Sequence, residues 1–170
     1  MSEHAPEDHL LAECNRIAGD SLYTSQAHFE CAASAKRRGR WLLTLPAAVA
    51  AVIGILTAVG LPGWLGAFSA AAALVAAVAS ILGVDREEGS HCQAGNSLTA
   101  LRHEARALAD TSWRELTHEQ LAYEVRRLSD RYGALITGLP TTDNKAFGRA
   151  RKRIKAGLFA PDQGPPKEQA

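Results

Sequence analysis

The sequence predicts an all-α protein in which a two-helix transmembrane hairpin is joined to a cytoplasmic helical bundle built from the N- and C-terminal helices. Two observations lead to this fold class. Residues 41–84 contain no charged side chain and no histidine. On both sides of this stretch, apolar and small residues recur at spacings of three and four, which is the period of amphipathic helices, and no alternating strand pattern occurs.

The first 40 residues predict one cytoplasmic helix. Small or apolar residues form one stripe along it: Leu11, Cys14, Ala18, Leu22, Ser25, Phe29 and Ala32. Such a stripe is typical of an amphipathic helix with one buried face. Only Gly19 and Gly39 interrupt the segment, so the helix can continue directly into the uncharged stretch.

The uncharged stretch predicts two membrane crossings, residues 41–59 and 64–84, separated by a Gly-Leu-Pro-Gly turn at residues 60–63. Each crossing has about the 17–25 residues that a helix needs to span a ~30 Å hydrocarbon core. The first crossing is rich in branched aliphatic residues. The second contains eight alanines, so it inserts less readily on its own.

Basic residues predict the orientation of the hairpin. Four of them directly precede the first crossing: Lys36, Arg37, Arg38 and Arg40. The turn between the crossings carries no charge, so the positive-inside rule places the N-terminus in the cytoplasm, and two crossings return the C-terminus to the same side. Trp41 and Trp64 begin the two crossings, where an indole ring suits the membrane interface.

Small residues recur on both crossings at spacings that allow helix backbones to approach closely. They are Ala50, Gly54 and Ala58 on the first crossing, and Gly66, Ala70, Ala73, Ala77 and Ser80 on the second. One hairpin offers more of these positions than its own two helices can cover. We therefore expect a homo-oligomer in the lipid bilayer.

Polar side chains are few within the crossings. The absence of Asp, Glu, Lys, Arg and His leaves no proton relay or ion-binding carboxylate there. Candidates for lining a pore are Thr57, Ser69 and Ser80. The alternative for such hydroxyl groups, and the commoner arrangement, is a hydrogen bond to a carbonyl of their own helix four residues earlier.

Residues 85–159 predict further cytoplasmic helices. The first two have apolar stripes at Leu98, Leu101, Ala105, Leu108 and Ser112, then at Leu121, Val125, Leu128, Tyr132 and Leu135. Thr-His-Glu-Gln at residues 117–120 predicts a capping box that opens the second of them, and Gly-Leu-Pro at residues 138–140 ends it. The interleaved charges predict a solvated outer face: Arg102, Glu104, Arg106, Glu124, Arg126, Arg127 and Asp130.

The last predicted helix begins near Asp143 and is strongly basic. Its six bases are Lys145, Arg149, Arg151, Lys152, Arg153 and Lys155. Phe147, Ala150, Ile154 and Leu158 share an apolar face. Three interpretations stay open: the helix lies against anionic lipid, binds a nucleotide or another anionic partner, or docks so that its bases pair with acids on neighbouring helices.

The sequence gives no indication of an enzyme. Cys14, Cys31 and Cys92 have no CxxC spacing and no compact set of histidine partners, so we expect reduced cysteines without a metal. His103 and His118 are predicted to lie on solvated helix faces. A glycine-rich phosphate loop, HExxH and GxSxG are all absent, and no cofactor is expected.

Several features occur together in a fixed layout. Lys-Arg-Arg-Gly-Arg-Trp at residues 36–41 leads into a first crossing with Pro46 near its start, and a short turn and an alanine-rich second crossing follow. The pattern Phe-x-x-Ala-x-x-x-Ile-Lys-x-Gly then occupies residues 147–157. Residues 160–170 are predicted to be disordered.

This layout resembles the SLATT family of bacterial two-transmembrane effectors, which are associated with nucleotide-synthesising and nucleotide-sensing domains. The resemblance spans roughly residues 10–160. It implies an antiphage effector of the bacterial inner membrane that permeabilises the bilayer when a nucleotide-generating or reverse-transcriptase partner, or a nucleotide or nucleic-acid trigger, activates it. The alternative function is a non-conducting anchor or scaffold that holds a partner protein at the bilayer.

Overall fold

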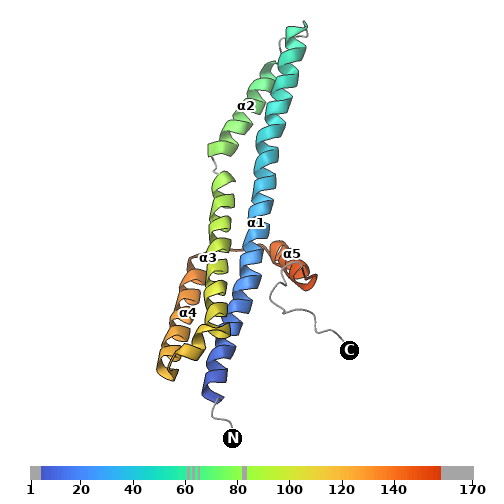
Figure 1. Ribbon diagram of the computed structural model, residues 1–170. Helices are drawn as coiled ribbons and strands as arrows, with labels where there is room; N and C mark the ends of the chain where they lie inside the picture. The colour runs from blue at the N-terminus through green and yellow to red at the C-terminus, as the bar shows by residue number, and fades with distance from the viewer. Residues whose placement is uncertain (1–4, 61, 63, 65, 82–83, 158–170) are drawn as a thin grey trace, which may run out of the picture. The chain divides into compact units, whose positions relative to one another are not determined.

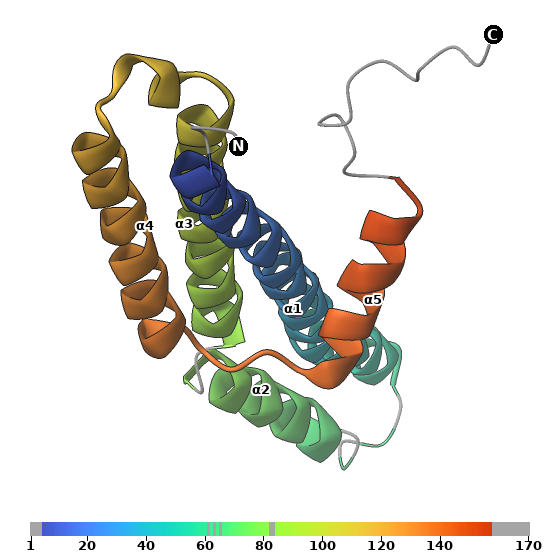
Figure 2. The same cartoon turned by 90° about the horizontal axis from the view of Figure 1, so that it is seen from below.

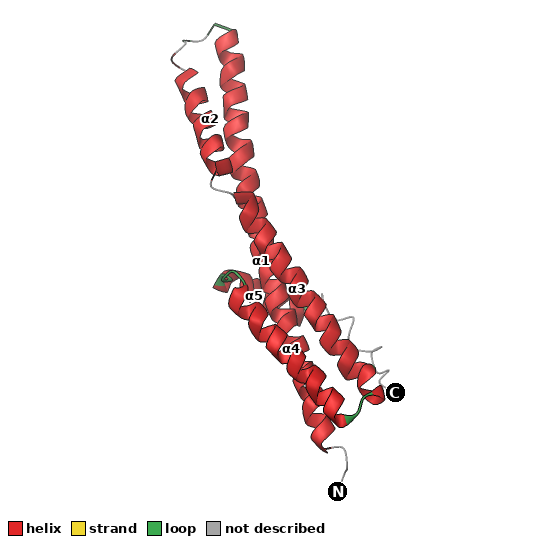
Figure 3. Cartoon of the chain, turned by 90° about the vertical axis from the view of Figure 1, so that its left-hand side faces the viewer, coloured by secondary structure: helices red, strands yellow, loops and turns green. Residues whose placement is uncertain are grey.

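The computed structural model describes residues 5–60, 62, 64, 66–81 and 84–157. Within that part of the chain every regular element is helical and no strand occurs (Figure 3), which confirms the all-α prediction. Part of the predicted turn at residues 60–63 and the predicted disordered tail at residues 160–170 lie outside the described residues, as do Leu158 and the side chain of Ser80.

Helix α1 (Ala5–Ala58) is a single helix of 54 residues. It continues through Gly19, Gly39 and Pro46, as the sequence predicts for a helix that leads directly into the apolar stretch. Beyond its end, Gly60 adopts a φ of +99°, a left-handed conformation that residues with a Cβ rarely adopt. Glycine at this position therefore stops the helix and opens the turn.

The chain divides into two compact units. The first, here called the bundle unit, comprises Met1–Glu30 and His91–Ala170, and the second, the apolar unit, comprises Cys31–Ser90. The apolar unit thus extends beyond the predicted hairpin of residues 41–84 in both directions. Outside the uncharged stretch, this unit includes the ion pairs of Lys36 and Arg38 of α1 with α3 (Val84–Asp110).

In the bundle unit, α1, α3 and α4 (His118–Gly138) pack side by side, as Figures 1 and 2 both show. Their common core consists of Cys14, Ile17, Ala18, Leu101, Ala105, Leu108, Leu121, Val125 and Leu128. Most of the predicted stripes are therefore confirmed as buried faces. Ser112 is an exception, because α3 ends at Asp110 and Ser112 lies exposed in the 3-10 helix η2 (Ser112–Glu115).

The predicted capping box at the start of α4 is present. The backbone N–H of Gln120 donates to Oγ1 of Thr117 at 3.3 Å, and the backbone N–H of Thr117 donates to Oε1 of Gln120 at 2.9 Å. These reciprocal bonds satisfy two backbone donors that have no partner within the helix. The helix ends at Gly138, as predicted.

Helix α5 (Asn144–Lys155) lies on the other side of α1 from α4 (Figures 1 and 2). Its N-cap is Asp143, whose Oδ1 accepts a 3.3 Å hydrogen bond from the backbone N–H of Lys145. Ala146 and Ala150 are its buried residues, whereas Phe147, which the sequence places on the apolar face, is 43% exposed. The buried side is thus shifted towards the smaller residues.

In the apolar unit, α2 (Gly66–Ile81) runs back alongside the last part of α1, as Figures 1 and 3 show. Its 16 residues correspond to a length of about 24 Å at 1.5 Å per residue. This is shorter than the predicted second crossing at residues 64–84 and shorter than a ~30 Å hydrocarbon core. The remaining length would have to come from residues on either side of α2.

Candidate functional site

The apolar unit exposes a large hydrophobic surface. Among the described residues, only α1 contains a segment long and apolar enough to cross a membrane by length and composition, and none of that segment is buried. The exposed large side chains of the unit are Trp41, Leu42, Leu45, Val49, Val52, Ile55, Leu56, Val59, Trp64, Phe68, Leu74, Val75 and Val78. A continuous exposed apolar surface of this kind is typical of a region covered by lipid or by another protein.

The small residues predicted to pack in the membrane are mostly exposed in the single chain. Gly54 and Ala58 of α1 are exposed, as are Ala70, Ala73 and Ala77 of α2, whereas Ala50 and Gly66 are half-buried. Among the described side chains of residues 41–78, the least exposed are half-buried and follow a different line: Pro46, Ala50, Ile53 and Thr57 on α1, and Gly66, Ser69, Ala72 and Ala76 on α2. The exposed small residues are therefore available for contacts outside the chain.

Hydroxyl groups in α1 bond to carbonyl groups of their own helix. Oγ1 of Thr57 donates to the carbonyl oxygens of Ile53 at 3.0 Å and Gly54 at 2.9 Å. Oγ1 of Thr44 donates to the carbonyl of Arg40 at 2.8 Å. Such bonds satisfy the hydroxyl groups locally, which is the second of the two arrangements expected from the sequence.

Two of the four basic residues before the apolar stretch have acidic partners on α3. Nζ of Lys36 lies 3.0 Å from Oε1 of Glu88, and Nη2 of Arg38 lies 2.9 Å from Oε1 of Glu87. All four side chains are at least partly exposed, so each pair contributes about 0–1 kcal/mol. The pairs therefore add little stability to the contact between α1 and α3.

A buried carboxylate holds α5 against α1. Glu30 accepts hydrogen bonds from Nε of Arg149 at 3.0 Å and from Nη1 of Arg153 at 2.6 Å. Burial raises the pKa of Glu30, but the hydrogen bonds and charges of Arg153 and Arg149 outweigh burial, and the net pKa is lowered. We call these three residues the Glu30 clamp.

The Glu30 clamp shows what two of the six bases of α5 contact. Arg149 and Arg153 are one turn apart on the same face of α5, so both reach a single carboxylate. This supports the interpretation that bases of α5 pair with an acid on a neighbouring helix. The other four bases of α5, Lys145, Arg151, Lys152 and Lys155, are exposed.

Two buried histidines meet between α1 and α3. His28 and His91 are 2% and 5% exposed, and their Nδ1 atoms are 3.0 Å apart. Burial, followed by the charge of His91, lowers the pKa of His28 to about 4. Sequence analysis missed this pair because 63 residues separate its members, although His28 lies one turn after Ser25 on the buried side of α1.

The described residues contain no group of three or more His, Cys, Asp or Glu side chains that could hold a metal ion. Cys14, Cys31 and Cys92 are free thiols. Burial, together with the charge of Glu13, raises the pKa of Cys14 to about 11, so this thiol is protonated at neutral pH and a poor nucleophile. His103 and His118 are exposed, as the sequence predicts.

No family model, curated protein or solved structure matches the chain.

Proposed function

We propose that the chain is a membrane effector whose apolar unit inserts into the bacterial inner membrane as a helical hairpin, oligomerises there and permeabilises the bilayer when triggered. On this proposal both termini lie in the cytoplasm. The observation that carries the proposal is the unburied apolar segment of α1. Because none of its residues is fully buried within the described chain, lipid is the simplest environment for the exposed side of this segment.

Aliphatic side chains on the surface of the apolar unit favour insertion. Each Leu, Ile, Phe or Val at the centre of a crossing contributes about 0.3–0.6 kcal/mol to membrane insertion. Val52 and Ile55 of α1 and Leu74 of α2 are among the exposed residues of this kind. Both α1 and α2 therefore have a side that suits lipid.

Exposed small residues support oligomerisation. A Cβ atom added at Gly54 would meet no atom within 4 Å, and Ala70 is exposed on α2. Helices associate in lipid through close backbone approach at small residues of this kind. We propose that copies of the hairpin meet along these positions.

A trigger would act on the bundle unit. An effector that is silent until activated requires two packings of the assembly, and the signal must bind the open one more tightly. The resemblance to the SLATT family supports an antiphage role and a nucleotide-generating or reverse-transcriptase partner as the source of the signal.

One observation favours a second function, that of a non-conducting anchor or scaffold that holds a partner protein at the bilayer. The hydroxyl groups of Thr44 and Thr57 bond within α1 and leave few free polar groups to line a water-filled path. An anchor needs the same hairpin but no polar lining.

Inducible expression in a bacterium, with a membrane-potential dye and viable counts, tests the proposal. The informative variant is Gly54→Leu/Ala70→Leu, since both positions are exposed in the single chain and a Cβ at Gly54 would meet no atom within 4 Å. The matched control is Ala48→Leu, because Ala48 is also exposed on α1 but lies about 120° around the helix from Gly54. All three proteins must reach the membrane in equal amounts.

Depolarisation by the parent and by Ala48→Leu, but not by Gly54→Leu/Ala70→Leu, would support a pore that assembles through the small residues. If the parent is silent, the assay is repeated with the neighbouring genes and a phage trigger. Full membrane potential under those conditions would overturn the effector function in favour of the anchor.

A further inference from the structure

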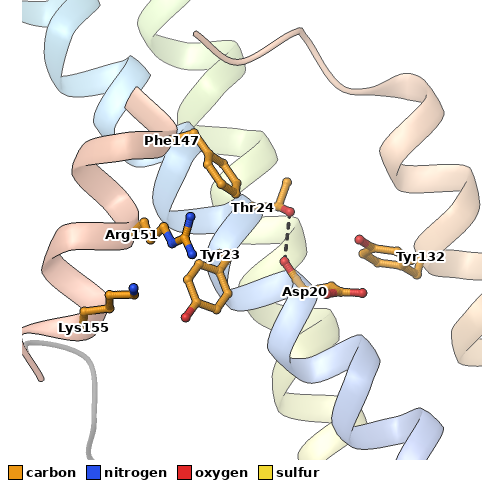
Figure 4. Close-up of a pocket in the computed structure, with 7 residues that line it drawn as sticks. All are labelled: Asp20, Tyr23, Thr24, Tyr132, Phe147, Arg151 and Lys155. Atoms are coloured by element: carbon orange, nitrogen blue, oxygen red, sulfur yellow. Dashed lines mark hydrogen bonds between the residues drawn. The ribbon is translucent and has the colours of Figure 1, made fainter. Parts of the chain in front are cut away.

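A cavity of about 340 Å³ lies in the bundle unit between α1, α4 and α5. Figure 4 shows Phe147, Arg151 and Lys155 extending from α5 towards α1, and Tyr132 approaching from α4 on the opposite side. Ligand pockets range from about 300 to 1,000 Å³. The cavity is therefore of the size that accepts one small molecule.

Aromatic side chains line this cavity from three different helices. Tyr23 belongs to α1, Tyr132 to α4 and Phe147 to α5. Phe147 is 43% exposed although it is a large apolar residue. The exposed ring of Phe147 and the ring of Tyr23 line the cavity on its α5 and α1 sides and provide flat apolar surface on which a planar ring can stack.

Basic residues outnumber acidic residues in the lining of the cavity. Arg151 and Lys155 line it, and neither has an ion-pair partner in the described part of the chain. The one lining carboxylate, Asp20, lies 2.8 Å from Nη1 of Arg16, a guanidinium that Glu13 also contacts, so the lining itself has two bases and one acid. The uncompensated charge of the cavity is therefore positive.

The Glu30 clamp keeps these cations in place. Arg149 and Arg153 lie on the side of α5 that faces Glu30. Arg151 is between them in sequence and therefore lies on a different side of the helix. Lys155 follows Arg151 by one turn, so both cations reach the same cavity. Two of the six bases of α5 are thus used for docking, and two others face the cavity.

We propose that this cavity binds a small anionic molecule with a planar aromatic ring, with its anionic group on Arg151 and Lys155 and its ring against Phe147 and Tyr23. The positive charge selects an anion, and the aromatic lining selects against anions without a ring. A nucleoside monophosphate has both features and is the simplest probe. The site belongs to the bundle unit alone, so it does not rest on the membrane function proposed above.

Calorimetric titration of the full chain in phosphatidylcholine nanodiscs tests this site with adenosine 5′-monophosphate as the probe. Two fragments of the probe separate its features: adenosine has the ring without the charge, and ribose 5-phosphate has the charge without the ring. A buffer with about 0.15 M salt screens exposed charges beyond about 8 Å and suppresses non-specific binding. We expect saturable binding of one nucleotide per chain. Either fragment should bind at least about tenfold more weakly than the nucleotide.

Two variants and one matched control locate the binding. Arg151→Ala and Phe147→Ala should each weaken nucleotide binding about tenfold, through a lost charge-assisted contact and a lost stacking surface respectively. Lys152→Ala removes the same charge from the next residue of α5, which is exposed and does not line the cavity. It should leave the affinity unchanged within about twofold.

Three outcomes would overturn the site. One is the lack of saturable binding at nucleotide concentrations up to about 2 mM, which corresponds to less than about 4 kcal/mol of binding free energy. Another is binding of ribose 5-phosphate as tight as that of the nucleotide, since the aromatic base would then contribute nothing to binding. The third is an equal loss in Lys152→Ala, because binding would then follow the general charge of α5.

Discussion

The imidazole rings of His28 and His91 face each other in the buried contact between α1 and α3, with their Nδ1 atoms 3.0 Å apart. One Nδ1 must donate a hydrogen and the other must accept it, so the contact requires at least one neutral ring. If both rings were protonated to the cationic form, two positive charges would lie side by side in a buried contact. The pair therefore makes the packing of α1 against α3 sensitive to acid.

We predict that the bundle unit loses stability between about pH 6.5 and pH 4 through His28. The pKa of His28 is lowered to about 4 in the folded chain, against about 6.5 for an unperturbed histidine. The unfolded chain then binds more protons than the folded chain in this range. The contribution of neutral His28 to stability is therefore complete above pH 6.5 and is lost as the pH decreases towards 4. The expected loss is on the order of 3 kcal/mol.

Thermal unfolding followed by circular dichroism, on the full chain in detergent from pH 4 to 7.5, measures this loss. His28→Gln should flatten the pH dependence, because glutamine keeps a hydrogen-bonding group beside His91 but does not titrate. His103→Gln is the control, since His103 is exposed on α3. An unchanged pH dependence in His28→Gln would show that other groups cause it.

Removing the charge of Glu30 should release α5. The side chain of Glu30 is 10% exposed, but those of Arg149 and Arg153 are 43% and 53% exposed, so Glu30→Gln should cost about 1–2 kcal/mol, less than a fully buried pair. Hydrogen exchange of residues 144–155 reports the release. Glu13→Gln, which breaks an exposed pair with Arg16 on the same helix, should leave this exchange unchanged.

The effect of Glu30→Gln should also depend on pH. The pKa of Glu30 is lowered in the folded chain, so its contribution is complete above the usual glutamate pKa of about 4.5 and disappears as pH falls through the lower folded value. Parent and variant should therefore exchange alike in strong acid. A difference that persists there would mean that the carboxylate charge is not what holds α5.

Much of the bundle unit follows from local patterns. The stripe through Cys14 and Ala18, the capping box at Thr117 and the helix end at Gly138 depend on residues within one or two turns, and the structure confirms each. Sequence analysis predicted too narrow a buried face on α1, however. Ile17 and His28 are also buried, because Ile17 belongs to the core shared with α3 and α4 and His28 faces His91 of α3.

Long-range pairs could not be predicted in the same way. Glu30 is 119 residues from Arg149, and a charge pattern within one helix does not identify its partner on another. The clamp also explains the difference at Phe147. Once Arg149 and Arg153 turn towards Glu30, the neighbouring buried positions are Ala146 and Ala150, and Phe147 lies beside the cavity instead.

Gly95 of α3 packs directly against the ring of Phe29 on α1. A Cβ atom at Gly95 would lie 2.6 Å from Cε1 of the Phe29 ring, closer than atoms can pack. Gly95→Val should therefore destabilise the bundle unit by about 1–3 kcal/mol through overpacking. A lowered thermal midpoint in the full chain measures this effect.

The control for Gly95 is Gly133→Ala on α4. Gly133 is exposed, and a Cβ there would meet no atom within 4 Å. This change should stabilise the chain by about 0.5–1 kcal/mol, the difference between alanine and glycine within a helix. Equal effects of the two substitutions would contradict the close contact at Phe29.

Thr117→Ala should remove the cap of α4 and cost about 1 kcal/mol. The hydroxyl of Thr117 accepts from the backbone N–H of Gln120, and alanine cannot replace this bond. Thr111→Ala is a suitable control because Thr111 precedes η2 without a side-chain cap bond. Denaturation midpoints that fall equally in both variants would argue against a specific role of the capping box.

Two charges on the apolar side of α1 should prevent stable insertion. Val52 and Ile55 are 55% and 65% exposed, so arginine at these positions fits the single chain but would face lipid. Each arginine costs about 2.5–3.5 kcal/mol at the centre of a crossing. Val52→Arg/Ile55→Arg should therefore be extracted from membranes by carbonate, whereas the parent should resist extraction. Tyr123→Arg, at a position that is 66% exposed in the bundle unit, should behave like the parent. Equal retention of the doubly charged variant would show that the apolar surface of α1 does not lie in lipid.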